Sequence, residues 1–246
     1  MQIVVASNCH GNLPALASLL TEVERLKERK REVSRIYLIG ILGVFPYARE
    51  VYELLSSSKN SFEDYHLVTP IKGKHDYLIE KPERMEVDDF PDFEKKALTF
   101  AHEALGHEGR KWLRISVPSS LAENFGNNRF YFTYSPAYSP ASEDVLPKMP
   151  TSYYESILSG LGKYDVIAVA GYQPFVIKTR YGKVVCPGSI SIAAGRDAKP
   201  SFAVIDVETT AVEFFNLEYS KSEVERKVRE SGLPEEIIKI LHHGFM

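Results

Sequence analysis

Three short apolar segments in the first third of the chain each lead directly into a polar or glycine-containing loop. The segments are Gln2–Ala6, Ile36–Gly40 and Tyr65–Ile71. Short apolar runs without clear alternation are typical of strands that are covered on both faces. Helices are predicted between them, over Leu13 to about Lys30 and over Ala48–Leu55. This alternation predicts an α/β fold, in which ligands gather at the carboxyl ends of the strands.

The second half of the chain predicts closely spaced strands. A hairpin is expected at Ala122–Phe125 and Phe130–Tyr134, and a proline-rich loop over Ser135–Pro150. Further strands are expected at Asp165–Ala170, Phe175–Thr179, Lys183–Cys186, Ser201–Val207 and Ala211–Phe215. The other predicted helices are Phe93–Leu105, Gly109–Ile115, Tyr153–Leu161, Lys221–Glu230 and Pro234–His242. Because no repeat or linker divides the chain, we expect one domain over residues 1–246 with a helical tail from about residue 219.

Composition excludes several classes of protein. Lys and Arg total 30 against 33 Asp and Glu, so the net charge of −3 argues against binding to bulk nucleic acid. Two cysteines do not make a disulfide framework. No membrane-length apolar run and no signal peptide are present, which predicts a cytoplasmic protein without a membrane partner. Gln occurs twice while Glu, Lys and Arg are abundant, a balance that favours a thermophilic source.

Six loops at strand ends carry the residues with the most chemistry. In order they are Asn8-Cys9-His10-Gly11-Asn12, Gly40-Ile41-Leu42-Gly43, Gly73-Lys74-His75-Asp76, Tyr134-Ser135, Gly171-Tyr172-Gln173-Pro174 and Cys186-Pro187-Gly188-Ser189. This series resembles the loops of the calcineurin-like metallophosphoesterases, specifically a compact bacterial and archaeal group. The resemblance extends from Gln2 to about Leu241. It implies a four-layer α/β (α+β) sandwich, in which two mixed β-sheets are flanked by helices.

The resemblance also implies a two-metal phosphoesterase centre, but the sequence departs from the family at most of its ligand positions. The departures are Asn8, Ile41, Lys74, Tyr134, Tyr172 and Pro174. His10 is the one family metal ligand that survives. A two-metal site needs anionic and imidazole ligands with a bridging carboxylate, whereas the Ile41 side chain has no lone pair. We therefore expect no cofactor and a family member that has lost catalysis.

The surviving and substituted residues form a candidate ligand-binding set, namely Asn8, His10, Lys74, His75, Tyr134, Tyr172 and Arg196. In one interpretation, Lys74 replaces the charge of the metal and the histidines donate to a phosphate-containing small molecule. The tyrosines would then flank a flat group of that ligand. In the other interpretation, Ile41, Tyr134, Tyr172 and Pro174 fill the former site and Lys74 points to solvent.

Three further alternatives stay open. An active phosphoesterase with a rebuilt site would use His75 as general acid and Asp76 as the group that orients it. A different metal arrangement would draw on His10, His75, Cys9, Cys186 or the pair His242-His243. If the apolar run from Ile41 to Phe45 were exposed, it would indicate a protein partner or a homodimer.

Overall fold

The structure is a computed structural model that describes residues 1–56, 68–83, 90–135, 145–194 and 199–244. Within these residues the strands form two mixed five-stranded sheets. The first sheet has the order β10-β9-β1-β2-β3. Its strands are β1 (Gln2–Ser7), β2 (Val33–Ile39), β3 (Val68–Ile71), β9 (Ser201–Asp206) and β10 (Val212–Asn216). Strands β1, β2 and β3 are parallel, while β9 runs antiparallel to both β1 and β10.

The second sheet has the order β4-β5-β6-β8-β7. Its strands are β4 (Ser120–Phe125), β5 (Asn128–Thr133), β6 (Val166–Val169), β7 (Pro174–Thr179) and β8 (Gly182–Pro187). Strands β5, β6 and β8 are parallel, and the two edge strands β4 and β7 run against them. The helices are α1 (Leu13–Glu28), α2 (Ala48–Ser56), α3 (Lys74–Glu80), α4 (Asp92–Ser116), α5 (Thr151–Ile157), α6 (Lys221–Glu230) and α7 (Glu236–His243).

Three buried clusters separate four layers, which confirms the predicted sandwich. Ile3 and Val5 of β1 face the second sheet, where Phe130 and Phe132 lie in the same cluster. Val4, the residue between them, faces the helices that cover the outer side of the first sheet. A third cluster packs α5 against the second sheet. Strand β1 shows no alternation of apolar and polar residues because both of its faces are covered.

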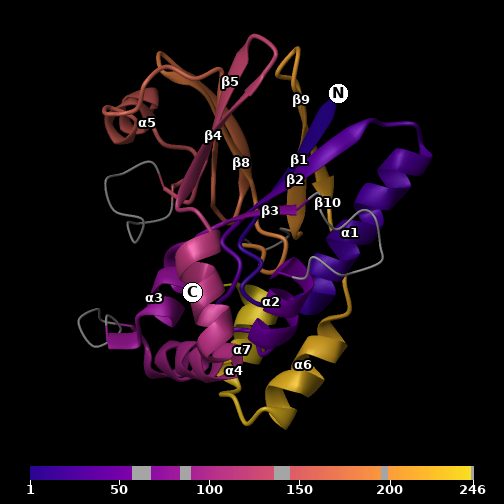
Figure 1. The fold of residues 1–246 in the computed structure, drawn as a ribbon, viewed down its shortest axis with the longest axis vertical. Coiled ribbons are helices and arrows are strands. Elements are labelled where there is room, and N and C mark those ends of the chain that lie inside the picture. The colour runs from indigo at the N-terminus through magenta and orange to yellow at the C-terminus, as the bar shows by residue number, and fades with distance from the viewer. Residues whose placement is uncertain (57–67, 84–89, 136–144, 195–198, 245–246) are drawn as a thin grey trace.

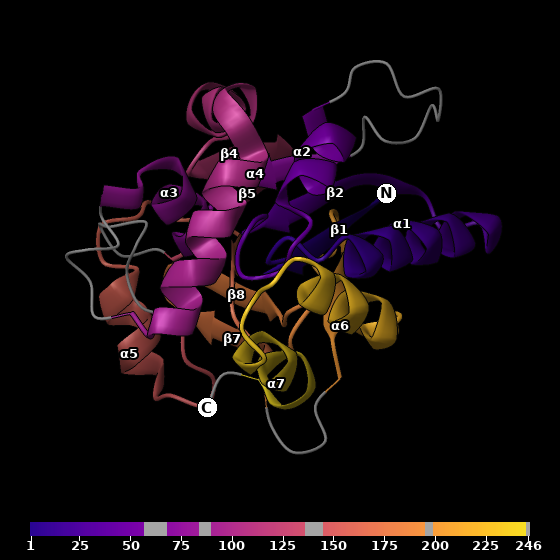
Figure 2. The same cartoon turned by 90° about the horizontal axis from the view of Figure 1, so that it is seen from below.

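Most helices gather at one end of the two sheets. In Figure 1 strand β1 starts at the top and runs down towards α2, α3, α4, α6 and α7, so its carboxyl end lies among these helices. Figure 2 shows α4, α6 and α7 in front of that end, while α1 and α5 lie towards opposite sides of the molecule. The loops after β1, β2 and β3 therefore meet where the α/β pattern predicts a site. None of the helices in the described ranges is long and apolar enough to cross a membrane.

Among the described residues, the predicted elements are found within a few residues of their expected ends, with one omission. Residues 65–67 of the predicted third strand and 136–144 of the predicted loop lie outside the described residues. Residues Gly73–Asp76 were expected as a loop, but α3 begins at Lys74. The reason is a cap, because the Asp76 carboxylate accepts a hydrogen bond from the backbone N–H of Gly73, the residue before the helix. The break expected between two helices in α4 is present at Gly106, where φ is 65° and ψ is −176°. Glycine adopts these angles without steric cost.

Helix α1 places the first loop of the site. Asn12 precedes it, and its side-chain oxygen accepts a hydrogen bond from the backbone N–H of Ala15 at 3.1 Å. Pro14 lies in the first turn, where its missing N–H costs no helical bond. The cap and the proline fix where the helix begins, so the preceding residues, including His10, must stay in the loop.

Candidate functional site

Two histidines lie side by side where the loops after β1 and β3 meet. His10 Nδ1 is 3.1 Å from His75 Nδ1, and both side chains are buried. His10 belongs to the loop after β1, and His75 to the first turn of α3. Burial, together with the neighbouring His75, holds the pKa of His10 well below its usual range. His10 is therefore a neutral imidazole at pH 7, with one nitrogen that donates and one that accepts.

The histidine pair is the centre of a longer chain of hydrogen bonds. His75 Nε2 lies 2.7 Å from Glu94 Oε1 of α4, and His10 Nε2 lies 3.1 Å from the Tyr172 hydroxyl. If both imidazoles are neutral, Tyr172 donates to His10, His10 to His75, and His75 to Glu94. All four ring nitrogens of the pair are thus already in contact with protein groups. The chain joins the end of the first sheet, α3, α4 and the loop after β6.

Asp76 accepts hydrogen bonds from the backbone and does not orient His75. Its carboxylate accepts hydrogen bonds from the backbone N–H groups of Ile41 at 3.0 Å, Leu42 at 2.8 Å and Gly73 at 2.7 Å. The side chain is fully buried, which raises its pKa to about 6 although the three N–H groups lower it. The group that contacts the distal nitrogen of His75 is Glu94, so the orienting contact expected from Asp76 is made by a different carboxylate.

The loop after β2 packs against the histidine pair. A Cβ on Gly43 would lie 2.6 Å from His10 Nδ1 and 2.9 Å from His75 Nδ1, so the backbone of this loop touches both rings. Ile41 and Phe45 at the two ends of the apolar run are buried, with exposures of 0% and 1%. The run from Ile41 to Phe45 therefore belongs to the core and offers no exposed surface for a partner or a second copy.

Tyr134, which follows β5 of the second sheet, lines the same small cavity as the histidine pair. Its side chain is buried, and its ring lies against the backbone of Gly73 closely enough that a Cβ there would be 2.9 Å from the ring. Asn8 is buried as well and donates from Nδ2 to the Gly171 carbonyl at 3.2 Å. The cavity left among these side chains and Lys74 is about 10 Å³. That is room for one water molecule.

The remaining predicted site residues lie in different places. The ammonium group of Lys74 is 4.7 Å from the centre of the Phe90 ring, a cation–π contact at the edge of the cavity. Cys9 and Cys186 are buried in two different clusters, and burial raises the pKa of Cys9 to about 12. His242 of α7 bonds Glu225 of α6 at 2.7 Å. Arg196 lies outside the described residues.

These residues do not fit a two-metal centre. In the described part of the chain there is no group of three or more His, Cys, Asp or Glu side chains that could hold a metal ion. At the position of the bridging carboxylate stands Ile41, which is buried and has no donor atom. Two metal ions at this place would lack a bridging carboxylate, because Asp76 is held by three backbone N–H groups and Glu94 by His75.

Two features of the site region were not found from the sequence. Glu94 is one of several acidic residues on a long helix, and nothing in its spacing distinguishes it. Lys72 and Glu80 form a buried ion pair of 2.8 Å beside the site, with side-chain exposures of 8% and 7%. Lys72 follows β3 and Glu80 is the last residue of α3, which packs against α4.

Known proteins resemble this chain in structure more clearly than in sequence. No protein-family model and no curated protein matches the sequence. The crystal structure of the hypothetical protein PH1004 from Pyrococcus horikoshii OT3 matches with 38% identity and a TM-score of 0.89, over 99% of this chain and 98% of that one. The chain belongs to the family of PH1004.

A second solved structure identifies the fold. The crystal structure of a metallophosphoesterase from Sphaerobacter thermophilus matches over 100% of this chain and 99% of its own, with 20% identity and a TM-score of 0.74. The PH1004-family chain thus has the metallophosphoesterase fold, which confirms the resemblance seen in its loops. At this identity the likeness concerns the fold, and the chemistry has to be argued from the residues of this chain.

Proposed function

We propose that this chain is a catalytically inactive protein of the metallophosphoesterase fold that acts by binding a small ligand or a protein partner. The observation that carries the proposal is the histidine pair, which we call closed because each of its ring nitrogens already contacts a protein group. His10 and His75 are 3.1 Å apart and bonded at their outer nitrogens to Tyr172 and Glu94. A metal ion or a substrate that binds at this place would have to break one of these buried hydrogen bonds.

The closed pair supports the interpretation that the former site is filled. The cavity of about 10 Å³ is several times too small for a phosphate group. A phosphate-containing ligand at this point would require Tyr134 to move away from Gly73, against which it packs. Lys74, the residue proposed to attract such a ligand, already has its ammonium over the Phe90 ring. Binding by this family member is therefore better supported at another surface.

The alternative is a phosphoesterase with a rebuilt site, and one contact favours it. The His75–Glu94 pair, 2.7 Å between Nε2 and Oε1, is the arrangement in which a carboxylate orients a catalytic imidazole. However, the catalytic nitrogen of such a pair must reach the substrate, and His75 Nδ1 faces His10 instead. Hydrolysis would need His10 to swing away from the pair.

The test combines elemental analysis of the freshly purified protein with phosphodiesterase and phosphatase assays in the presence of manganese. We expect no stoichiometric metal and no turnover above that of a buffer blank. His10→Ala is the informative variant, and His107→Ala is its matched control because the His107 side chain on α4 is 77% exposed. Turnover that is lost in His10→Ala and kept in His107→Ala would overturn the proposal and establish a rebuilt enzyme.

A further inference from the structure

A second, larger cavity lies between α4 and α7. It has a volume of about 390 Å³, within the range of roughly 300 to 1,000 Å³ that small-molecule sites occupy. The first turn of α4 forms one wall and one side of α7 forms the other. The side chains that matter for recognition are Phe93, Glu94, Glu236, Lys239, Ile240 and His243. Glu94 links the two sites, because it lines this cavity and also contacts His75.

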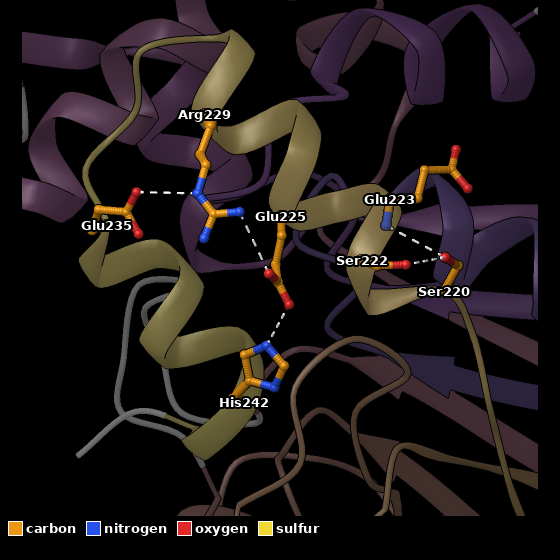
Figure 3. A network of polar contacts seen from close by, with 7 residues as sticks. All are labelled: Ser220, Ser222, Glu223, Glu225, Arg229, Glu235 and His242. Atoms are coloured by element: carbon orange, nitrogen blue, oxygen red, sulfur yellow. Dashed lines mark hydrogen bonds and ion pairs between the residues drawn. The ribbon is translucent and has the colours of Figure 1, made fainter.

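The wall formed by α7 is held in place from two sides. Ile237 and Leu241 are buried in the core. Glu225 of α6 contacts His242 of α7 at 2.7 Å, and Arg229 of α6 contacts Glu235, just before α7, at 3.3 Å, so these pairs tie the two helices together, as Figure 3 shows. A cavity between fixed walls loses little conformational entropy when it binds a ligand.

The charges around the cavity favour a cation. Glu94 and Glu236 contribute two carboxylates and Lys239 one ammonium group, which leaves one net negative charge before any charge on His243, or on His75 in contact with Glu94, is counted. Glu94 is the buried member, with 7% of its surface exposed, while Glu236 and Lys239 are exposed. The buried carboxylate exerts the stronger field, because charges interact more strongly where water is excluded.

The apolar part of the lining sets a second requirement. The half-buried aromatic ring of Phe93 and the buried side chain of Ile240 offer no hydrogen bonds, so they favour an apolar body in the ligand. The Glu94 carboxylate has about four lone-pair sites. It can therefore accept a hydrogen bond from a ligand and keep its contact with His75.

We propose that this cavity binds a small organic amine, with its ammonium group against Glu94 and its apolar body between Phe93 and Ile240. The inference goes beyond the proposed function, and the two sites share Glu94. It assigns to the chain a ligand class that differs from a phosphoester in charge, and a site that differs from the metal position of the fold.

Isothermal titration calorimetry on the full chain tests this with three probes of similar size, namely benzylamine, benzyl alcohol and benzoate. We expect benzylamine to bind in the millimolar range or better and benzoate not to bind. Glu94→Gln keeps the shape of the side chain and an oxygen that accepts from His75, but removes the charge. It should weaken benzylamine binding by about tenfold to a hundredfold. Glu236→Gln, the matched control at the exposed rim, should change it by less than about fivefold.

Three results would overturn the proposal. One is no heat of binding for benzylamine with the natural protein, and another is equal affinity for benzylamine and benzyl alcohol. The third is equal effects of the Glu94→Gln and Glu236→Gln substitutions. The comparison of the probes uses the natural protein, so it stays decisive even if Glu94→Gln fails to fold. None of these outcomes bears on hydrolysis, which is measured separately with phosphoester substrates.

Discussion

Replacing Gly43 by alanine tests the packed histidine pair most directly. The φ angle of Gly43 lies outside the left-handed region, so alanine meets no backbone strain there. Its Cβ would instead lie 2.6 Å from His10 Nδ1 and 2.9 Å from His75 Nδ1. Ordinary contact needs about 3.5 Å, so the rings would have to move by roughly 0.6 to 0.9 Å. Such a movement breaks or stretches their mutual hydrogen bond of 3.1 Å.

The expected cost is about 1.5 to 4.5 kcal/mol of unfolding free energy. Overpacking in a core costs about 1 to 3 kcal/mol, and the loss of a buried hydrogen bond adds about 0.5 to 1.5 kcal/mol. Urea unfolding measures the change as a fall of the midpoint by roughly 1 M, with the slope unchanged. Gly162→Ala is the matched control, since a Cβ at Gly162 meets no atom within 4 Å. Equal stability of the two alanine variants would refute the packing of this loop on the histidines.

Three further predictions concern buried charge. Asp76→Ala removes the acceptor of three buried N–H groups and should lower the unfolding free energy by about 3 kcal/mol or more; a loss below about 1 kcal/mol in urea unfolding would contradict this. Lys72→Met should lower the unfolding free energy by about 3 to 5 kcal/mol because it leaves the buried Glu80 carboxylate without its ammonium partner. In a double-mutant cycle, adding Glu80→Leu should recover much of that loss. The lowered pKa of His10 means that the unfolded chain takes up a proton below pH 6.5 that the folded chain does not. Stability should therefore fall as the pH drops below 6.5, by up to about 1.4 kcal/mol per pH unit, and calorimetry should show a shallower fall in His10→Asn.

Much of the fold was predictable because its signals are local. The apolar strands, their glycine-containing loops and the helical spacing of leucines are read within windows of a few residues. The unbroken apolar run of β1 predicted burial on both faces, and the structure places Val4 and Val5 in different clusters on its two sides. The start of helix α3 was not predicted because its cap depends on the Asp76 carboxylate. The other two hydrogen bonds of that carboxylate come from the loop after β2.

The departure from the family's metal ligands is a prediction that the sequence makes by itself. Ile41 lacks a lone pair and Pro174 lacks an imidazole wherever the fold places them, so no tertiary contact can restore these donors. What occupies the corresponding place in this chain could not be predicted. The sequence left open a phosphate pocket and a filled site, and the two differ in where Lys74 and Tyr134 point. Their directions depend on Phe90 and Gly73, which come from other parts of the chain.

Only the tertiary structure decided which carboxylate contacts His75. Asp76 follows His75 directly, and yet Glu94, from the next helix, makes the bond to it. The physical reason is that neighbours in a helix point away from one another, while side chains from two packed helices converge. The cavity between α4 and α7 has the same origin. Sequence determined which groups this protein possesses, and the packing of distant elements decided which of them meet.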